Sequence, residues 1–219
     1  MSLYDSHPAR PDQQDPTERP VLCVDMGGVF FTYSFLSALA AWAEAAGTDA
    51  TRLRERWQID GPFDAFERGE IAPADYLDHL RRLLGLHRLS DEEIAAGWNA
   101  IYDTVDTDLV QLLGRPEVRA RFHRVVGVSN TNTLHADFWR ALYRDQLPVL
   151  DTVHCSHEIG ATKPQAAFFD HVAAAHGVDR SRLVLVDDIA EVTTAATGLG
   201  LRTHHYQDAA HLAAYLNTL

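Results

Sequence analysis

The feature that most constrains the fold is a short apolar run, Val21–Val24, which ends abruptly at Asp25. Its length and its β-branched residues are typical of a strand buried inside a parallel sheet. Gly27 and Gly28 follow almost at once and allow the backbone to turn tightly. A carboxylate at the carboxyl end of such a strand lies where open α/β sheets bind their ligands. Taken alone, Asp25 could equally cap a turn, so its interpretation depends on the rest of the chain.

From Asp108 onward, segments with helical spacing alternate with short apolar runs. The runs predicted to be strands are Val125–Val128, Thr152–Cys155, Leu183–Val186 and Leu201–Tyr206. The predicted helices are Leu109–Leu113, Glu117–Phe122, Leu134–Leu142, Pro164–His176, Ile189–Leu199 and Ala209–Leu216. Strands that alternate with helices indicate a parallel sheet with right-handed crossover connections. We therefore predict an α/β fold in which helices flank a parallel sheet.

The segment before Asp106 has helical spacing instead. The predicted helices are Tyr33–Gly47, Asp49–Trp57, Gly61–Gly69, Pro73–Leu84 and one that opens with a capping box at Ser90–Glu93. No alternation typical of a strand interrupts Tyr33–Val105. We therefore predict an all-helical insert at residues 32–105 and a core made of residues 21–31 and 106–219. The polar, proline-rich residues 1–20 are expected to be disordered.

Charge and composition exclude some partners. The net charge of −12 argues against nucleic acid and anionic membranes, because the chain lacks the basic surface that replaces their counterions. No apolar run has the length of a membrane-spanning helix or the pattern of a signal peptide. Cys23 and Cys155 lack metal-ligand spacing and are expected to be reduced thiols. These features favour a cytoplasmic protein, and the sequence does not indicate its oligomeric state.

Polar residues follow several of the predicted strands. They are Asp25, the pair Ser129-Asn130 and the pair Asp187-Asp188. Because the carboxyl ends of parallel strands share one edge of the sheet, these side chains should converge. Lys163, the only lysine in the chain, stands at a helix start and could point into the same crevice. This set of groups suits a divalent cation such as Mg²⁺ together with a phosphoryl group, which a carboxylate could attack.

In order and spacing, these motifs resemble the haloacid dehalogenase (HAD) superfamily, in the subclass with a helical cap inserted after the first strand. The residues that match are Asp25-Met26-Gly27-Gly28-Val29, Ser129-Asn130, Lys163-Pro164 and Asp187-Asp188. The resemblance covers nearly everything from Val21 onward and implies a Rossmann-like core. Further segments, Phe66–Glu70 and Ser129–His135 with Phe138-Trp139, are most similar to bacterial sugar-phosphate phosphatases, notably the α-glucose-1-phosphate phosphatases.

The resemblance implies a magnesium site. Asp25 would be the nucleophile, would form an aspartyl-phosphate and would also bind Mg²⁺. Gly27 would offer its main-chain carbonyl to the metal. Asp188 would be the other carboxylate ligand, and Asp187 would assist at the metal or its waters.

The resemblance also implies a phosphoryl site. Ser129 and Asn130 would hold phosphoryl oxygens, and Lys163 would neutralise their charge. The implied activity is Mg²⁺-dependent hydrolysis of a small phosphorylated metabolite, with a sugar phosphate as the expected substrate.

Gly27 departs from the family pattern, because most phosphatases of this family have an Asp there that protonates the leaving oxygen and later activates water. Such acid–base help is worth about 10²–10⁴ in rate. Two alternatives therefore stay open, a 2-haloacid dehalogenase and a catalytically impaired protein that binds a phosphorylated ligand or a partner. The Asp187-Asp188 pair argues against the dehalogenase, since adjacent buried carboxylates without a cation repel each other.

Several other side chains are expected to be structural. Trp42, Phe63, Phe66 and Trp98 fall at helical spacing and are predicted to lie in a core rather than against substrate. Arg68 and His135 are expected to have structural or surface roles.

Overall fold

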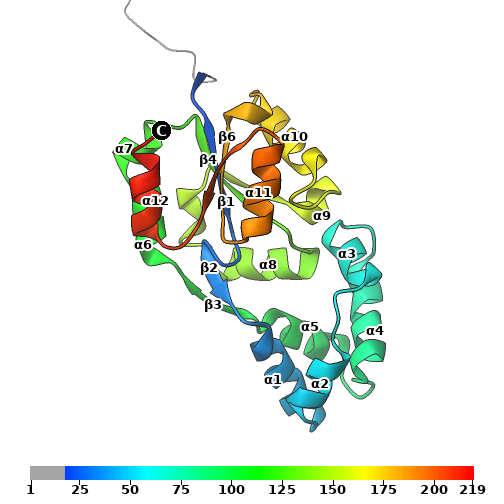
Figure 1. Ribbon diagram of the computed structural model, residues 1–219. Coiled ribbons are helices and arrows are strands. Elements are labelled where there is room, and N and C mark those ends of the chain that lie inside the picture. Colours follow the sequence, from blue (N-terminus) through cyan, green and yellow to red (C-terminus); the bar gives the residue numbers. More distant parts are fainter. Residues whose placement is uncertain (1–17) are drawn as a thin grey trace, which may run out of the picture.

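The structure is a computed structural model that describes residues 18–219 (Figure 1). The sequence predicts disorder for residues 1–20. Of these, the structure describes only 18–20, and the others lie outside the described residues. Helices and strands fill most of the described chain, and they form a sheet-containing core and a separate group of helices.

A five-stranded sheet organises the core. Its strands are β1 (Val21–Asp25), β4 (Arg124–Ser129), β5 (Thr152–Cys155), β6 (Leu183–Asp187) and β7 (Arg202–His205). Their order across the sheet is β5-β4-β1-β6-β7, and every neighbouring pair is parallel. The predicted α/β fold is thereby confirmed. β1 is the central strand, and all of its residues are buried, as its uninterrupted apolar run predicts.

Alternate side chains of β1 enter two separate apolar clusters, one on each face of the sheet. Leu22 and Val24 pack on one face with residues of α6 (Thr107–Gly114), α7 (Pro116–Arg119), α8 (Thr133–Leu142) and α12 (Ala209–Leu216). Val21 and Cys23 pack on the other face with α10 (Ala166–Ala175) and α11 (Ala190–Gly198). The remaining short helices of the core are α9 (Ser156–Ile159), η2 (Leu147–Val149) and η3 (Arg180–Arg182). This two-sided burial is the pattern expected for a parallel sheet.

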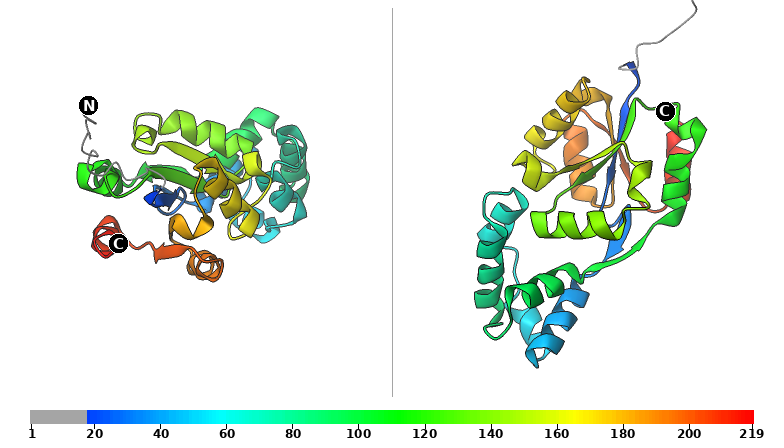
Figure 2. Two further views of the ribbon diagram at one scale, coloured as in Figure 1. Left: turned by 90° about the horizontal axis from the view of Figure 1, so that it is seen from above. Right: turned by 180° about the vertical axis from the view of Figure 1, so that it is seen from behind.

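Five helices form a lobe with its own apolar centre. They are α1 (Phe35–Ala46), α2 (Ala50–Arg56), α3 (Gly61–Glu67), α4 (Pro73–Leu84) and α5 (Asp91–Asn99). We call residues 35–99 the helical lobe; Figures 1 and 2 show it beyond the carboxyl ends of the strands. The predicted capping box of α5 is confirmed, because Ser90 and Glu93 each bond the other's backbone N–H.

The prediction of helices alone up to Val105 was wrong at both ends of the lobe. β2 (Phe31–Tyr33) and β3 (Tyr102–Val105) form an antiparallel two-stranded ribbon that connects the lobe to the core. The helical spacing of apolar residues that starts at Ile94 continues through Ile101 and Tyr102 and predicts a longer last helix, but that helix ends at Asn99. The ribbon is short, and its pairing joins segments far apart in the chain, so local periodicity does not reveal it.

The predicted start of the helix at Pro164 was also wrong. The Lys163–Pro164 peptide bond is cis, and the N–H of Gln165 donates to the carbonyl of Thr162 in a tight turn. α10 begins only at Ala166. Pro164 therefore belongs to the turn that carries Lys163, and the preference of proline for a first helical turn misplaced it.

Cys23 and Cys155 are both free and buried, in agreement with the expected reduced thiols. Between residues 18 and 219, the structure has no helix whose length and apolar character would suit a membrane span.

The packing of α5 against α1 provides a stability test. A Cβ at Gly97 would lie 2.1 Å from Nε1 of Trp42, a ring that is fully buried. We expect Gly97→Ala to lower the free energy of unfolding in urea by about 1–3 kcal/mol, because the core is overpacked. The matched control is Gly198→Ala at the end of α11, where a Cβ meets nothing within 4 Å. That change should be neutral or stabilise by about 0.4–1 kcal/mol, so equal losses in the two variants would contradict the packing.

Candidate active site

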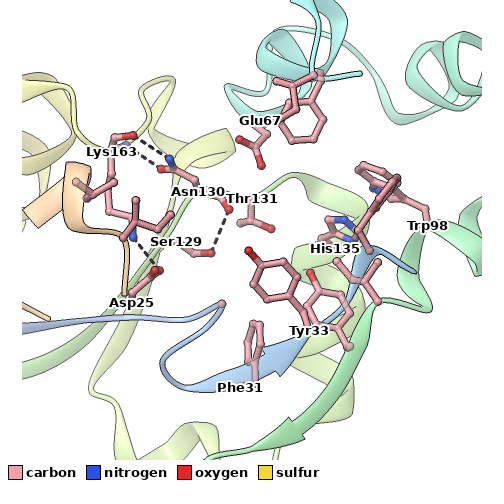
Figure 3. Close-up of a pocket in the computed structure, with 18 of the residues that line it drawn as sticks. Asp25, Phe31, Tyr33, Glu67, Trp98, Ser129, Asn130, Thr131, His135 and Lys163 are labelled. Carbon is pink, nitrogen blue, oxygen red and sulfur yellow. Dashed lines mark hydrogen bonds and ion pairs between the residues drawn. The ribbon is translucent and has the colours of Figure 1, made fainter. Parts of the chain in front are cut away.

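The structure brings the predicted site residues together at the carboxyl ends of β1, β4 and β6. Asp25, Ser129 and Lys163 line a pocket of about 440 Å³ that lies between this edge of the sheet and the helical lobe (Figure 3). Asp25 is the last residue of β1 and Ser129 the last of β4, so the ends of two adjacent parallel strands supply the floor. Convergence at one sheet edge, as the topology predicts, is confirmed.

Lys163 joins two carboxylates from neighbouring strands. Its Nζ lies 2.7 Å from Oδ1 of Asp25 and 2.7 Å from Oδ2 of Asp187. All three residues are buried. The two carboxylates also accept hydrogen bonds from the backbone. Met26 N–H donates to Asp25 Oδ1, and Ile189 N–H donates to Asp187 Oδ1. The ammonium is therefore held at a fixed place beside Asp25.

Burial and charge shift the pKa values of these groups in different directions. Burial disfavours the charged form of Lys163, but Asp25 and Asp187 outweigh it and raise the pKa of the ammonium. Burial raises the pKa of Asp25 above the ordinary value, although Lys163 pulls it down. Burial, and then the charge of Asp187, raises the pKa of Asp188. The carboxylates outnumber the single ammonium, so the site favours an additional positive charge.

The arrangement fits a divalent cation. Asp25, Asp187 and Asp188 each offer a carboxylate oxygen, and these oxygens lie within 4.8 Å of one another. Oδ1 of Asp188 is a buried atom without a hydrogen-bond partner among the described residues. Gly28 makes room for Asp188, since its φ is +84° and a Cβ there would lie 2.2 Å from Oδ2. Hard carboxylate oxygens at such spacing are the ligands that Mg²⁺ prefers.

Asn130 lies beside the pocket, but its side chain is engaged with the main chain of Lys163. The amide of Asn130 donates to the carbonyl of Lys163 at 2.9 Å, and its Oδ1 accepts from the N–H of Lys163 at 2.7 Å (Figure 3). The structure therefore gives the Asn130 side chain a role that the motif did not predict, which is to fix the turn that carries the lysine.

The ring of Tyr33 crowds the space that a side chain at position 27 would enter. A Cβ built on Gly27 would lie 3.1 Å from Cε1 of Tyr33 and 3.9 Å from Cε2 of Phe31. Both rings line the pocket. The Cβ of an aspartate at position 27 would press on the ring of Tyr33, which would have to give by a few tenths of an ångström.

Aromatic side chains from the lobe and the ribbon form most of the pocket wall. They are Phe31, Tyr33, Phe35, Trp57, Phe63, Trp98 and Tyr102. Two of the four aromatic residues predicted to be structural, Trp42 and Phe66, are fully buried in the lobe. The other two, Phe63 and Trp98, belong to the same cluster and also line the pocket. Helical spacing alone does not separate these positions.

His135 and Arg68 have structural contacts, as expected. The Nδ1 of His135 lies 2.9 Å from Oδ1 of Asn99, and its ring stacks on Trp98 at the pocket wall. Burial lowers the pKa of His135 to about 3, so the imidazole is neutral. Arg68 pairs with Glu70 through two hydrogen bonds.

Glu67 is a charged residue of the pocket that the motifs did not assign to the site. It is the last residue of α3, and its carboxylate points into the pocket from the lobe, across from Asp25 (Figure 3). The sequence carried one signal, because Glu67 lies in the segment Phe66–Glu70 that resembles known phosphatases. Nothing in its local pattern distinguishes it from other glutamates at helix ends.

No protein-family model matches the chain. Among curated proteins, the sesquiterpene phosphatase astK of Aspergillus oryzae is 26% identical over 184 residues, which are 84% of this chain and 88% of that protein. Among solved structures, a HAD family enzyme of Bacteroides thetaiotaomicron in complex with magnesium and inorganic phosphate has a TM-score of 0.74 and 25% identity. The match covers 89% of this chain and 98% of that one.

A L-2-haloacid dehalogenase of Xanthobacter autotrophicus, with chloropropionic acid covalently bound, is also similar. Its TM-score is 0.59 at 18% identity, over 91% of this chain and 83% of that one. This likeness shows a shared fold and does not bear on the reaction.

The buried ion cluster provides the second test. Lys163→Met should lower the free energy of unfolding by about 3–5 kcal/mol at pH 8, because Asp25 and Asp187 stay buried without their cation. The loss should shrink toward pH 5, since burial raises the folded-state pKa of Asp25 and protonation then removes the unpaired charge. Urea unfolding at both pH values measures the effect. Arg144→Met, at an exposed surface pair, should change stability by less than about 0.5 kcal/mol; a similar change in both variants would contradict the buried cluster.

Proposed function

Because this chain belongs to the HAD superfamily, we propose that it is a Mg²⁺-dependent phosphatase that hydrolyses a small phosphomonoester through an aspartyl-phosphate. The observation that carries the proposal is the cluster of Asp25, Asp187 and Asp188, with the buried ammonium of Lys163 between the first two. A nucleophile, an internal cation and further hard oxygen ligands then meet at one end of the pocket. This combination suits phosphoryl transfer, whose catalysis rests on positioning and charge stabilisation.

The residues of the site have separate tasks in this proposal. Lys163 and Met26 hold Oδ1 of Asp25, so we assign Oδ2 to the attack on phosphorus. Lys163 neutralises a phosphoryl oxygen beside the nucleophile, and the hydroxyl of Ser129 donates to another. Asn130 acts on the reaction by fixing Lys163 through its main chain.

Asp25, Asp188 and the carbonyl of Gly27 would hold Mg²⁺, and Asp187 would assist there. A bound Mg²⁺ supplies positive charge that stabilises the phosphoryl oxygens and orients them. Support for this metal comes from the Bacteroides thetaiotaomicron enzyme, whose structure contains magnesium and inorganic phosphate, and from the unpartnered Oδ1 of Asp188.

The same cluster favours a phosphatase over a 2-haloacid dehalogenase. Asp187 and Asp188 lie beside Asp25 in the arrangement of a cation site. Without a cation, these carboxylates would repel one another and oppose an ionised nucleophile. The similarity to a sesquiterpene phosphatase points in the same direction.

The pocket wall favours an apolar leaving group. Most polar residues lie at the floor, whereas the side toward the lobe is lined mainly by aromatic rings and by Ile59 and Ile101, with Arg54 and Glu67 as its charged members. A sugar would leave most of its hydroxyl groups unpaired against such a wall, and unpaired polar groups are costly to bury. We therefore propose the phosphate ester of an apolar alcohol as substrate, in place of the sugar phosphate that the motifs suggest. The named substrate class of the Aspergillus oryzae relative supports this choice.

We also propose that the helical lobe, with the ribbon, is the cap of the enzyme. It supplies the apolar wall of the pocket, and the ribbon of β2 and β3 connects it to the core. The division at residues 32–105 is the one that the sequence predicts. A cap in this place excludes water from the phosphoryl group and selects the substrate.

Asp25→Asn tests the nucleophile. We expect phosphate release to fall at least 10⁴-fold, an order of magnitude taken from the loss of covalent catalysts, while the near-isosteric amide preserves the fold. The measurement is phosphate release from an aryl phosphate with Mg²⁺ or with a chelator, and the chelator should abolish wild-type activity. Substantial turnover by Asp25→Asn would refute the mechanism. Metal-independent halide release from 2-haloacids would instead support the dehalogenase, and tight phosphate-ligand binding without turnover would support the binding protein.

The apolar wall is tested with decyl phosphate and glucose 1-phosphate. Wild-type kcat/KM should be higher for decyl phosphate. Ile59 lines the pocket and is 70% exposed, so Ile59→Asn should raise KM for decyl phosphate about 3–10-fold through lost apolar contact and leave the fold intact. Leu36→Asn is the control, since Leu36 is 68% exposed and lies outside the pocket lining. A preference for glucose 1-phosphate that Ile59→Asn leaves unchanged would favour the sugar phosphate.

A further inference from the structure

An alkyl phosphate poses a chemical problem at this site. Its leaving alkoxide is a strong base, and its departure is slow unless a proton arrives as the bond to phosphorus breaks. Asp25 attacks in line, so the leaving oxygen faces away from Asp25 and toward the helical lobe. Gly27 has no side chain to donate that proton, and Tyr33 fills the space beside it.

Glu67 stands where such a donor is needed. Its carboxylate enters the pocket from the lobe, opposite Asp25 (Figure 3). Its main chain is anchored to the core, because the buried hydroxyl of Ser156 donates to the Glu67 carbonyl at 2.6 Å. The same hydroxyl oxygen accepts from the N–H of Thr131, two residues after Ser129, at 2.8 Å. The helix end that bears Glu67 is thus fixed to the loop that follows β4.

Three other titratable groups of the pocket are poor donors. His135 is neutral at working pH, since burial lowers its pKa to about 3. Burial and nearby carboxylates raise the pKa of the Tyr33 phenol above its usual value, which makes it a weaker acid. Lys163 is bonded to Asp25 and Asp187 on the nucleophile's side of the pocket.

We propose that Glu67 is the general acid and base of this enzyme and supplies from the lobe the carboxyl that Gly27 lacks in the core. The inference rests on the proposed phosphatase function and deepens it. It assigns a catalytic role to a residue outside the motifs at the ends of the strands.

The proton balance closes over two steps. In the first step, Oδ2 of Asp25 bonds to phosphorus, the bond from phosphorus to the leaving oxygen breaks, and the Glu67 carboxyl gives its proton to that oxygen. In the second step, the Glu67 carboxylate takes a proton from water, the water oxygen bonds to phosphorus, and the bond to Asp25 breaks. Phosphate and the alcohol leave, and Glu67 is again protonated.

The surroundings of Glu67 suit both halves of this cycle. Burial, and then the charge of Asp64, raises the pKa of Glu67 to about 7, although Lys163 lowers it. An acid with a pKa near the working pH can both give and regain a proton. The remaining titratable groups that sense its charge are the phenols Tyr33, Tyr76 and Tyr102. Burial raises the pKa of each phenol, so they stay neutral across this range.

Glu67→Gln tests the proposal with a series of phosphate esters that runs from 4-nitrophenyl phosphate to decyl phosphate. We expect kcat/KM, which reports the steps up to departure of the leaving group, to fall about 10²-fold or more for decyl phosphate and to change little for 4-nitrophenyl phosphate, because nitrophenolate leaves without a proton. The dependence of rate on leaving-group pKa should therefore be steeper in the variant. An unchanged slope would overturn the role of Glu67.

The pH profile gives a second readout. For decyl phosphate, kcat/KM of the wild type should fall as the pH rises through the pKa of Glu67, because the acid form of Glu67 is lost. That limb should be absent from Glu67→Gln, and its persistence would also overturn the proposal. Glu67→Ala with added formate offers a further variant, since a small acid that enters the vacated space should restore the rate for decyl phosphate.

Two controls separate this inference from the proposed function. Glu70→Gln makes the same change three residues away, at an exposed glutamate that pairs with Arg68, and should leave the slope and the pH profile unchanged. Asp25→Asn should be inactive toward every ester in the series. Wild-type protein without activity toward any ester would refute both proposals, whereas active wild type with a normal slope in Glu67→Gln would refute Glu67 alone.

Discussion

The contact on which the site depends is the buried ammonium of Lys163 between Asp25 and Asp187. Two carboxylates at the ends of adjacent strands would repel each other inside the protein, and the lysine makes their proximity tolerable. The lysine in turn requires a turn of fixed shape, which the Asn130 side chain holds through both the main-chain N–H and the carbonyl of Lys163. β1, β4, β6 and the turn before α10 are thus placed by one network, and the pocket floor follows from it.

The pocket is built from two parts of the protein. The core presents Asp25, Lys163 and the carboxylates of Asp187 and Asp188, all at one edge of the sheet. The helical lobe presents the aromatic wall and Glu67. In the proposed enzyme, phosphoryl chemistry belongs to the core, whereas selection of the alcohol and delivery of its proton belong to the lobe. In that enzyme, the same helices would both select the substrate and supply the proton to its leaving oxygen.

The core and its floor could be predicted because their signals are local. Val21–Val24 and Leu183–Val186 are continuous apolar runs, and each ends in a carboxylate, so topology alone brings Asp25 and Asp187 together. The wall could not be predicted in this way. Trp42 and Trp98 have the same helical spacing, and only the lobe's tertiary packing leaves one in the core and the other at the pocket. The strand Tyr102–Val105 pairs with a segment about seventy residues earlier, and the main chain of Glu67 is held by a hydrogen bond from Ser156, about ninety residues later in the chain.

Ser156 has a consequence for how the lobe can separate from the core. Its hydroxyl has one hydrogen but two carbonyl oxygens in reach, Glu67 O at 2.6 Å and Thr131 O at 2.9 Å. If the lobe moved away, rotation about the Cβ–Oγ bond would redirect this hydrogen bond to the Thr131 carbonyl, so the hydroxyl would keep a partner on the core side. The Glu67 carbonyl would then be free to bond water. Separation at this junction would therefore exchange one hydrogen bond for another rather than lose it.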